Sequence, residues 1–256
     1  MSRSIEGITR TLRAAGCVFA EDEAILILAD VPTDLLDQVI AQRVAGQPLE
    51  YLLGWGEFYG LRIAVQPGVF VPRRRSEVLV RAALPLCQPG MIVIDMCCGA
   101  GPVAAALQQA NPTLRLYGVD VSRDALDCAT ANVPGMEVFE GDLYDALPTQ
   151  LRGTIELIVA NAPYVPTDSI SYMPTEARDH ENRSALDGGP DGTQIQKRVA
   201  EGATRWLAPG GTLMIETSVR QAPLTEDLMN SVGFRTSVVR EADVDGTAVV
   251  GVLPDP

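Results

Sequence analysis

The sequence has 256 residues, enough for one large domain or for a medium and a small one, and its 46% of hydrophobic residues supply a sizeable core. A net charge of −13 argues against nucleic acid as the main partner, and no apolar run reaches the length of a membrane span. The N-terminus lacks a signal-peptide pattern, and five cysteines without a CxxC pair indicate reduced thiols, so we expect a cytoplasmic protein. His180 is the only histidine, which excludes metal sites and catalytic triads built on several histidines.

Residues 1–47 show the apolar spacing of three helices. Apolar side chains recur every three or four residues in a first helix that ends near Gly16, in a second around Ala24 and in a third that opens at Pro32-Thr33. The positions expected to face a common core are Ile5, Ile8, Leu12, Ala24, Ile25, Leu28, Leu35, Leu36, Val39 and Ile40. These stripes predict a small helical bundle.

Between residues 48 and 75 the pattern changes to short strands. Two apolar runs, 51–59 and 61–65, are joined around Gly60 and predict a β-hairpin. Pro67-Gly68 and Pro72 interrupt the chain after the hairpin, and we place the boundary of the next domain near residue 75.

From residue 76 onward strand and helix patterns alternate, which predicts a mostly parallel sheet covered by helices. The expected strands are 91–95, 115–119, 137–139, 155–160 and 212–216, followed by an antiparallel pair at 234–240 and 247–252. The stretch 167–193 is polar, rich in glycine and long for a loop, which is typical of a functional segment.

The buried strand 155–160 ends in the tetrapeptide Asn161-Ala162-Pro163-Tyr164. In open α/β sheets, ligands bind at the carboxyl ends of the strands. The Asn161 side chain offers one carbonyl acceptor, and proline fixes φ, so the Ala162 carbonyl points in a set direction. A planar amide or amine nitrogen would give its two hydrogens to these two oxygens while its face packs on Tyr164. A strand-ending turn capped by asparagine is the structural alternative.

A glycine-rich loop and three acids suggest a nucleotide site. Asp95 to Gly101 follows the first strand of the sheet and opens a helix, whose free N–H groups attract anions. Asp120 ends the next strand, where a carboxylate suits a ribose diol. Asp142 follows the third strand, and its carboxylate could accept from an adenine amino group.

Two cofactors compete for this loop. Gly99-x-Gly101-x-x-Ala104 fits the dinucleotide fingerprint. The carboxylate of Asp95 would instead repel a pyrophosphate and attract the cationic amino group of S-adenosylmethionine. Acids at the loop, after the second strand and after the third therefore favour S-adenosylmethionine, and we expect no metal.

Further motifs extend the pattern along the chain. They are Gly46-Gln47-Pro48, Tyr51, Gly54, Glu57-Phe58-Tyr59-Gly60-Leu61, Pro67-Gly68-Val69, Val71-Pro72-Arg73, Gly141-Asp142-Leu143, the stretch 185–192 and Pro209-Gly210-Gly211. From about residue 43 to residue 216 the sequence resembles the release-factor glutamine methyltransferase family, whose members use S-adenosylmethionine. The motifs before Pro72 are specific to that family, because general methyltransferases lack the helical domain and the hairpin.

The resemblance implies an α/β fold, a Rossmann-like class I methyltransferase sheet with a small N-terminal helical domain. It implies a substrate-recognition domain at 1–47, a β-hairpin linker at 48–75 and a methyltransferase domain at 76–256. The implied reaction is methylation of the side-chain amide nitrogen of a glutamine in the Gly-Gly-Gln loop of peptide-chain release factors. Asn161 and the Ala162 carbonyl would hold that amide between Pro163 and Tyr164. The implied cofactor contacts are Asp95, Cys97, Gly99, Gly101, Asp120, Val121, Asp142, Leu143 and Asn161.

The sequence departs from the family pattern near the acceptor. Ala162 replaces the first proline of Asn-Pro-Pro-Tyr, Arg74 and Arg75 replace a proline and an acid, and Asn182 stands where a proline is usual. The run Arg73-Arg74-Arg75 is expected to form a solvated face or interdomain ion pairs rather than a nucleic-acid groove. It could also touch a release-factor or ribosomal surface.

Three other functions remain open on the sequence alone. They are methylation of a small-molecule amine or amide, methylation of adenine in DNA, and binding without catalysis. For the favoured reaction we expect direct in-line transfer from sulfonium to nitrogen without a general base, because His180 lies alone in the loop 167–193. Orientation and charge stabilisation would supply most of the rate enhancement.

Overall fold

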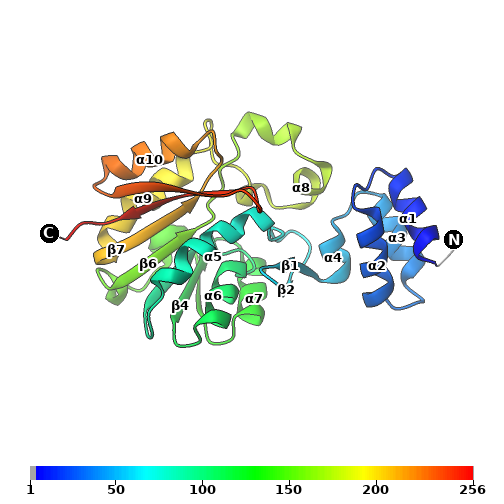
Figure 1. Ribbon diagram of the computed structural model, residues 1–256, viewed down its shortest axis with the longest axis horizontal. Coiled ribbons are helices and arrows are strands. Elements are labelled where there is room, and N and C mark those ends of the chain that lie inside the picture. Colours follow the sequence, from blue (N-terminus) through cyan, green and yellow to red (C-terminus); the bar gives the residue numbers. More distant parts are fainter. Residues whose placement is uncertain (1–3, 256) are drawn as a thin grey trace.

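The computed structural model describes residues 4–255, and its first helices form a bundle at the N-terminal end of an elongated molecule (Figure 1). The helices are α1 (Ile5–Ala14), α2 (Ala20–Asp30), α3 (Leu36–Val44) and α4 (Leu49–Leu53). They share a hydrophobic cluster of their own. The predicted inward positions Ile5, Ile25 and Leu35 are wrong, since all three are exposed. Ala20, Ala24 and Ile27 form the buried stripe of α2, which turns Ile25 to the outer face.

The hairpin is present but shorter than predicted. Strands β1 (Trp55–Phe58) and β2 (Leu61–Ala64) pair antiparallel through a Tyr59-Gly60 turn in which both residues have positive φ. The first part of the predicted run 51–59 is helix α4 instead of strand. Leu49 is part of the bundle cluster, and Gly54 ends α4 in the left-handed conformation.

The predicted parallel sheet is confirmed within residues 4–255. It has seven strands in the order β5-β4-β3-β6-β7-β9-β8, all parallel except for the pairs made by β9. The strands are β3 (Ile92–Met96), β4 (Arg115–Asp120), β5 (Glu137–Glu140), β6 (Ile155–Ala160), β7 (Leu207–Glu216), β8 (Arg235–Glu241) and β9 (Gly246–Val252). The antiparallel pairing of the last two strands also agrees with the prediction.

Helices cover both faces of the sheet (Figure 1). On one face lie α5 (Glu77–Ala83), α6 (Pro102–Ala110) and α7 (Arg123–Asn132), and on the other α9 (Gln194–Trp206) and α10 (Ala222–Ser231). Successive side chains of β3 separate accordingly, Val93 into the first core and Ile94 into the second. The hairpin packs into the first core through Phe58 and Ile63.

The order of the strands in the sheet changes side at β3. Strands β4 and β5 extend the sheet to one side of β3, whereas β6 pairs with its other side, with Met96 opposite Ala160. Such a switch point opens a crevice beyond the carboxyl ends of the strands. The glycine loop and the tetrapeptide 161–164 therefore begin on neighbouring strands.

The division at 47/48 and 75/76 stays a prediction. The bundle cluster continues past residue 47 to Leu49, with Leu52 and Leu53 packed against it. The segment 167–193 contains helix α8 (Thr175–His180) and two 3-10 turns, Thr167–Tyr172 and Arg183–Ala185. In residues 4–255 we find no helix with the length and apolar character needed to cross a membrane.

Candidate active site

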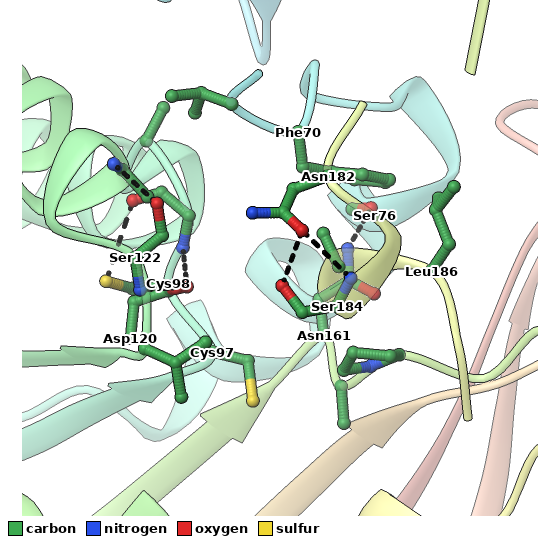
Figure 2. A pocket seen from close by; sticks show the side chains of 18 of the residues that line it. Phe70, Ser76, Cys97, Cys98, Asp120, Ser122, Asn161, Asn182, Ser184 and Leu186 are labelled. Atoms are coloured by element: carbon green, nitrogen blue, oxygen red, sulfur yellow. Dashed lines mark hydrogen bonds between the residues drawn. The ribbon is translucent and has the colours of Figure 1, made fainter. Parts of the chain in front are cut away.

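A cleft lies at the carboxyl ends of β3, β4 and β6, where the predicted site residues converge. Figure 2 shows Asp120 and Ser122 on one side and Asn161, Ser76, Asn182 and Ser184 on the other. The predicted site residues that line the cleft are Asp95, Cys97, Gly99, Asp120, Val121, Leu143, Asn161, Ala162, Pro163 and Tyr164. The structure thus brings together the glycine loop and the tetrapeptide, which are about 60 residues apart in the chain.

Asp120 ties the glycine loop to the end of β4. Its Oδ2 atom accepts from the Gly99 amide at 2.9 Å, and Oδ1 accepts from the Ser122 amide at 2.9 Å. Burial raises the pKa of Asp120, and these backbone hydrogen bonds oppose the rise. Each carboxylate oxygen keeps a second lone pair, so Asp120 can also accept from the hydroxyls of a ribose.

Asp95 is a buried carboxylate that forms no ion pair with the other described residues. It is 4% exposed, its Oδ2 atom accepts from the Ala104 amide at 3.1 Å, and burial raises its pKa to about 8, with Asp120 as a lesser cause. Within residues 4–255, no arginine or lysine forms an ion pair with it. A cationic amino group bound beside it would stabilise the ionised form, so the site fits the methionyl end of S-adenosylmethionine.

The opposite side of the cleft, here named the acceptor side for the substrate expected there, is built around Asn161. Its Nδ2 atom donates to the Ser76 hydroxyl at 3.1 Å, which leaves Oδ1 without a partner among the described residues. The Tyr164 hydroxyl donates to Glu216 Oε1 at 3.2 Å, and burial raises the pKa of Tyr164, with Glu216 as the next cause. Ala162 between them is buried and lines the cleft.

The sequence patterns did not identify Ser76 and Glu216 as residues of the site. Glu216 is the last residue of β7 and is 1% exposed, so it follows the same rule that singled out Asp95 and Asp120, an acid at the carboxyl end of a buried strand. Ser76 lies in the segment before α5 and reaches Asn161 across 85 positions of sequence. No local pattern marks a contact of that kind.

Comparisons with known proteins agree with this geometry. Residues 60–178 match the family described as "Methyltransferase small domain". The release factor glutamine methyltransferase of Geobacter sulfurreducens is 36% identical over 200 residues, which cover 77% of this chain and 69% of that relative. The protein of the same name from Mycolicibacterium smegmatis is 32% identical in an alignment that covers 95% of this chain and 93% of that relative.

The chain belongs to the release factor glutamine methyltransferase family. This membership confirms the expected family, the class of enzyme and the cofactor, S-adenosylmethionine. A further relative is the 4-amino-L-phenylalanine/4-methylamino-L-phenylalanine methyltransferase of Streptomyces pristinaespiralis, 32% identical over 88% of this chain and 80% of its own. A methyltransferase structure from Pyrococcus furiosus, 15% identical, shares the fold with a TM-score of 0.58 over 77% of this chain and 90% of that one.

Two of the cofactor contacts expected from the family lie outside the cleft lining. Gly101 precedes α6 with φ +75°, and a Cβ there would lie 3.2 Å from side-chain atoms of Ala129 and Val133, so this glycine allows α6 to approach α7. Asp142 forms an ion pair with Arg198 at 2.8 Å. Leu143, the residue after Asp142, has a positive φ and lines the cleft, whereas Asp142 does not line it. Cofactor contacts by Gly101 and Asp142 remain predictions.

Two arginines of the run 73–75 form ion pairs inside the molecule. Arg73 pairs with Glu181, and Arg75 Nε lies 3.6 Å from Glu216 Oε1. The Arg75 guanidinium also lies 5.9 Å from the centre of the Tyr164 ring. These contacts favour the ion-pair interpretation of the run 73–75 over a nucleic-acid groove.

The segment 167–193 closes the acceptor side of the cleft. Its residues Met173, Asn182 and Ser184 line the cleft, while the side chain of His180 is outside the lining. Buried Arg43 of α3 connects this segment to the bundle, since its Nη1 atom lies 2.6 Å from Glu176 of α8 and its Nε atom 2.7 Å from Glu23 of α2. Arg43 therefore joins the N-terminal bundle to the segment that lines the cleft.

Proposed function

We propose that the protein transfers the methyl group of S-adenosylmethionine to the side-chain amide nitrogen of a glutamine in the Gly-Gly-Gln loop of a peptide-chain release factor. The observation that carries this proposal is the position of Asn161. Its Nδ2 atom is hydrogen-bonded to Ser76, its Oδ1 atom has no partner among the described residues, and it lines the same cleft as Asp95 and Asp120. The substrate named for the Geobacter and Mycolicibacterium relatives supports it.

The cleft suits a weak nitrogen nucleophile. The lone pair of an amide is delocalised, so the nitrogen attacks only when it is aligned with the sulfonium methyl group. As the nitrogen gains positive charge, its hydrogen bonds to Asn161 Oδ1 and to the Ala162 carbonyl would strengthen. The aromatic ring of Tyr164 would pack on the amide plane. S-adenosylmethionine supplies the methyl group when bound, with its amino group at Asp95 and its ribose at Asp120.

The proposal also concerns the cellular compartment and the partners of the protein. We expect it to act in the cytoplasm, where release factors are found and where the five cysteines, all free in the structure, stay reduced. We expect no membrane as a direct partner, since no apolar run in the sequence reaches the length of a membrane span, and no nucleic acid, since the net charge is −13.

A small-molecule amine is the second candidate acceptor. The Streptomyces relative is named for methylation of an aromatic amine of an amino acid, and Ala162 and Arg75 change the acceptor side of this cleft. An arylamine nitrogen also has hydrogens to donate to Asn161. The proposal nevertheless names the release factor, because relatives so named include one that matches 95% of this chain.

The deciding experiment is radiolabelled methyl transfer from S-adenosylmethionine to purified release factor. The acceptor is offered intact and with its Gly-Gly-Gln glutamine changed to alanine, beside parallel reactions with 4-amino-L-phenylalanine and with duplex DNA. Label that depends on the glutamine is the expected result. Label on the amino acid or on DNA alone would overturn the proposed acceptor, and cofactor binding without transfer to any of them would indicate a binding protein.

A further inference from the structure

Glu216 is a buried acid beside the acceptor side of the cleft that the reaction itself does not use. Its side chain is 1% exposed and is absent from the cleft lining, so it touches neither cofactor nor acceptor. The Tyr164 hydroxyl donates to its Oε1 atom at 3.2 Å, and Arg75 Nε lies 3.6 Å from the same atom. Oε2 makes no hydrogen bond of ordinary length and angle within residues 4–255.

Ser76 contacts Asn161 and lies close to this acid. Its side chain is buried, and its Oγ atom accepts from Asn161 Nδ2 at 3.1 Å (Figure 2). Burial raises the pKa of Glu216, while the Ser76 hydroxyl, the Arg75 cation and the Tyr164 hydroxyl lower it. Ser76 therefore lies close to the carboxylate, and its proton, for which the described residues show no other acceptor, can turn toward the unpartnered Oε2 atom.

The charge of Glu216 sets the direction of the whole chain of hydrogen bonds. The Arg75 cation favours the ionised form, and an ionised carboxylate can only accept, so a hydrogen bond between Ser76 and Glu216 would have Ser76 as its donor. Having given its single proton to Glu216, the Ser76 hydroxyl can only accept from Asn161, which turns Nδ2 toward Ser76 and Oδ1 toward the cleft. If Ser76 donated to Asn161 instead, the amide would rotate and present Nδ2, a donor, to a nitrogen that also donates.

We propose that Ser76 and Glu216 are positioning residues, which fix the side-chain amide of Asn161 with its Oδ1 atom turned toward the acceptor nitrogen. The proposal rests on the proposed N-methylation but not on the release factor, because any acceptor nitrogen with a hydrogen to donate needs the same orientation.

The sharpest test is Glu216→Gln. Glutamine has nearly the same shape, but its NH₂ group donates to Ser76, which sends the Ser76 proton to Asn161 and rotates the amide. We expect kcat for methyl transfer to fall about 10-fold or more, as is typical when a hydrogen bond is left facing the wrong partner. Because Arg75, the cation that loses its partner, is 47% exposed, the protein should stay folded with at most a modest loss of melting temperature. The dissociation constant for S-adenosylmethionine should not change.

Two substitutions of Ser76, one that removes its hydroxyl and one that keeps it, test the same role. Ser76→Ala removes the hydroxyl and should lower kcat by about 10-fold, whereas Ser76→Thr keeps the hydroxyl and should restore most of it. Thr225→Val is the matched control. Thr225 is a buried hydroxyl that donates to Gln196, whose side chain donates to the Glu216 backbone carbonyl, yet it lies outside the cleft lining. It should lower stability without a selective loss of kcat.

A readout without substrate separates this proposal from the proposed function. With asparagine labelled by ¹⁵N, the side-chain NH₂ signal of Asn161, assigned by its loss in Asn161→Asp, should show one hydrogen-bonded proton in the native protein and a changed pattern in Glu216→Gln. Native kcat and an unchanged signal in Glu216→Gln would overturn the positioning role, as would equal losses of cofactor affinity and kcat. An inactive native protein with the expected signal would count against the proposed function alone.

Discussion

The two halves of the cleft are built differently. On the cofactor side, Asp95 and Asp120 lie on adjacent strands of one sheet and are held by backbone amides of Ala104, Gly99 and Ser122. On the acceptor side, the Asn161 side chain is held by another side chain, that of Ser76, which lies 85 positions away in the sequence and close to Glu216 at the end of β7. Backbone hydrogen bonds survive most substitutions, whereas contacts between side chains do not. Three of the departures from the family pattern, at residues 75, 162 and 182, line the acceptor side, whereas Arg74 does not line the cleft.

This comparison predicts that binding and transfer can be separated. The largest effect is expected for Asn161→Ala, which removes the acceptor oxygen but none of the groups around Asp95 and Asp120. Loss of one preorganised hydrogen bond in a transition state typically costs about 100- to 1,000-fold in kcat. Single-turnover transfer and calorimetric titration with S-adenosylmethionine measure the two quantities. Comparable losses in both would show that the two halves do not act separately.

Asp95→Asn tests the other half. Because burial raises the pKa of Asp95 to about 8, we expect it to be mostly protonated at pH 7 in the cofactor-free protein and to ionise when a cationic amino group binds beside it. Binding at pH 7 should therefore release close to one proton, and affinity should rise toward pH 8. Titrations in two buffers of different ionisation enthalpy give the proton count. The asparagine variant should release no proton from this site and bind about 10-fold more weakly, because a charged hydrogen bond is lost.

The same shift predicts how stability varies with pH. Because the pKa of Asp95 is raised on folding, the unfolded chain loses this proton first, so the free energy of unfolding should fall as pH rises from the ordinary value of 3.8 toward about 8. Asp95→Asn should remove that part of the decline in the cofactor-free protein. An unchanged slope would mean that the carboxylate is already ionised without a ligand.

The difference between the halves also explains what the sequence could reveal. The strands and the acids that end them follow local patterns, so the sequence alone was enough to assign Asp95, Asp120 and Asn161 to the cleft. Gly101 was harder, because the same glycine serves a phosphate loop or a close helix contact. Ser76 depends on a contact across 85 positions, which no periodicity encodes. Helix α4 was misread because its leucines fold against the bundle rather than into the hairpin.

The smallest predicted effect concerns the connection between the bundle and the acceptor wall. Glu176→Gln weakens the pair with Arg43, at 2.6 Å, while the pair of Arg43 with Glu23 remains. Since Glu176 is 45% exposed, the loss should be about 0.5–1 kcal/mol, or about 2- to 5-fold in KM for the acceptor. The KM for S-adenosylmethionine should stay constant.

The matched control for this change is Glu201→Gln, which weakens a surface pair with Lys197 on α9. It should leave both KM values unchanged, since long exposed pairs contribute little. Steady-state kinetics with the acceptor varied at saturating cofactor, and then the reverse, separate the cases. If Glu176→Gln raised the KM for the cofactor as much as the KM for the acceptor, α8 would affect both sides of the cleft. The acceptor side could then not be altered independently of the cofactor side, contrary to what the hydrogen bonds around Asn161 indicate.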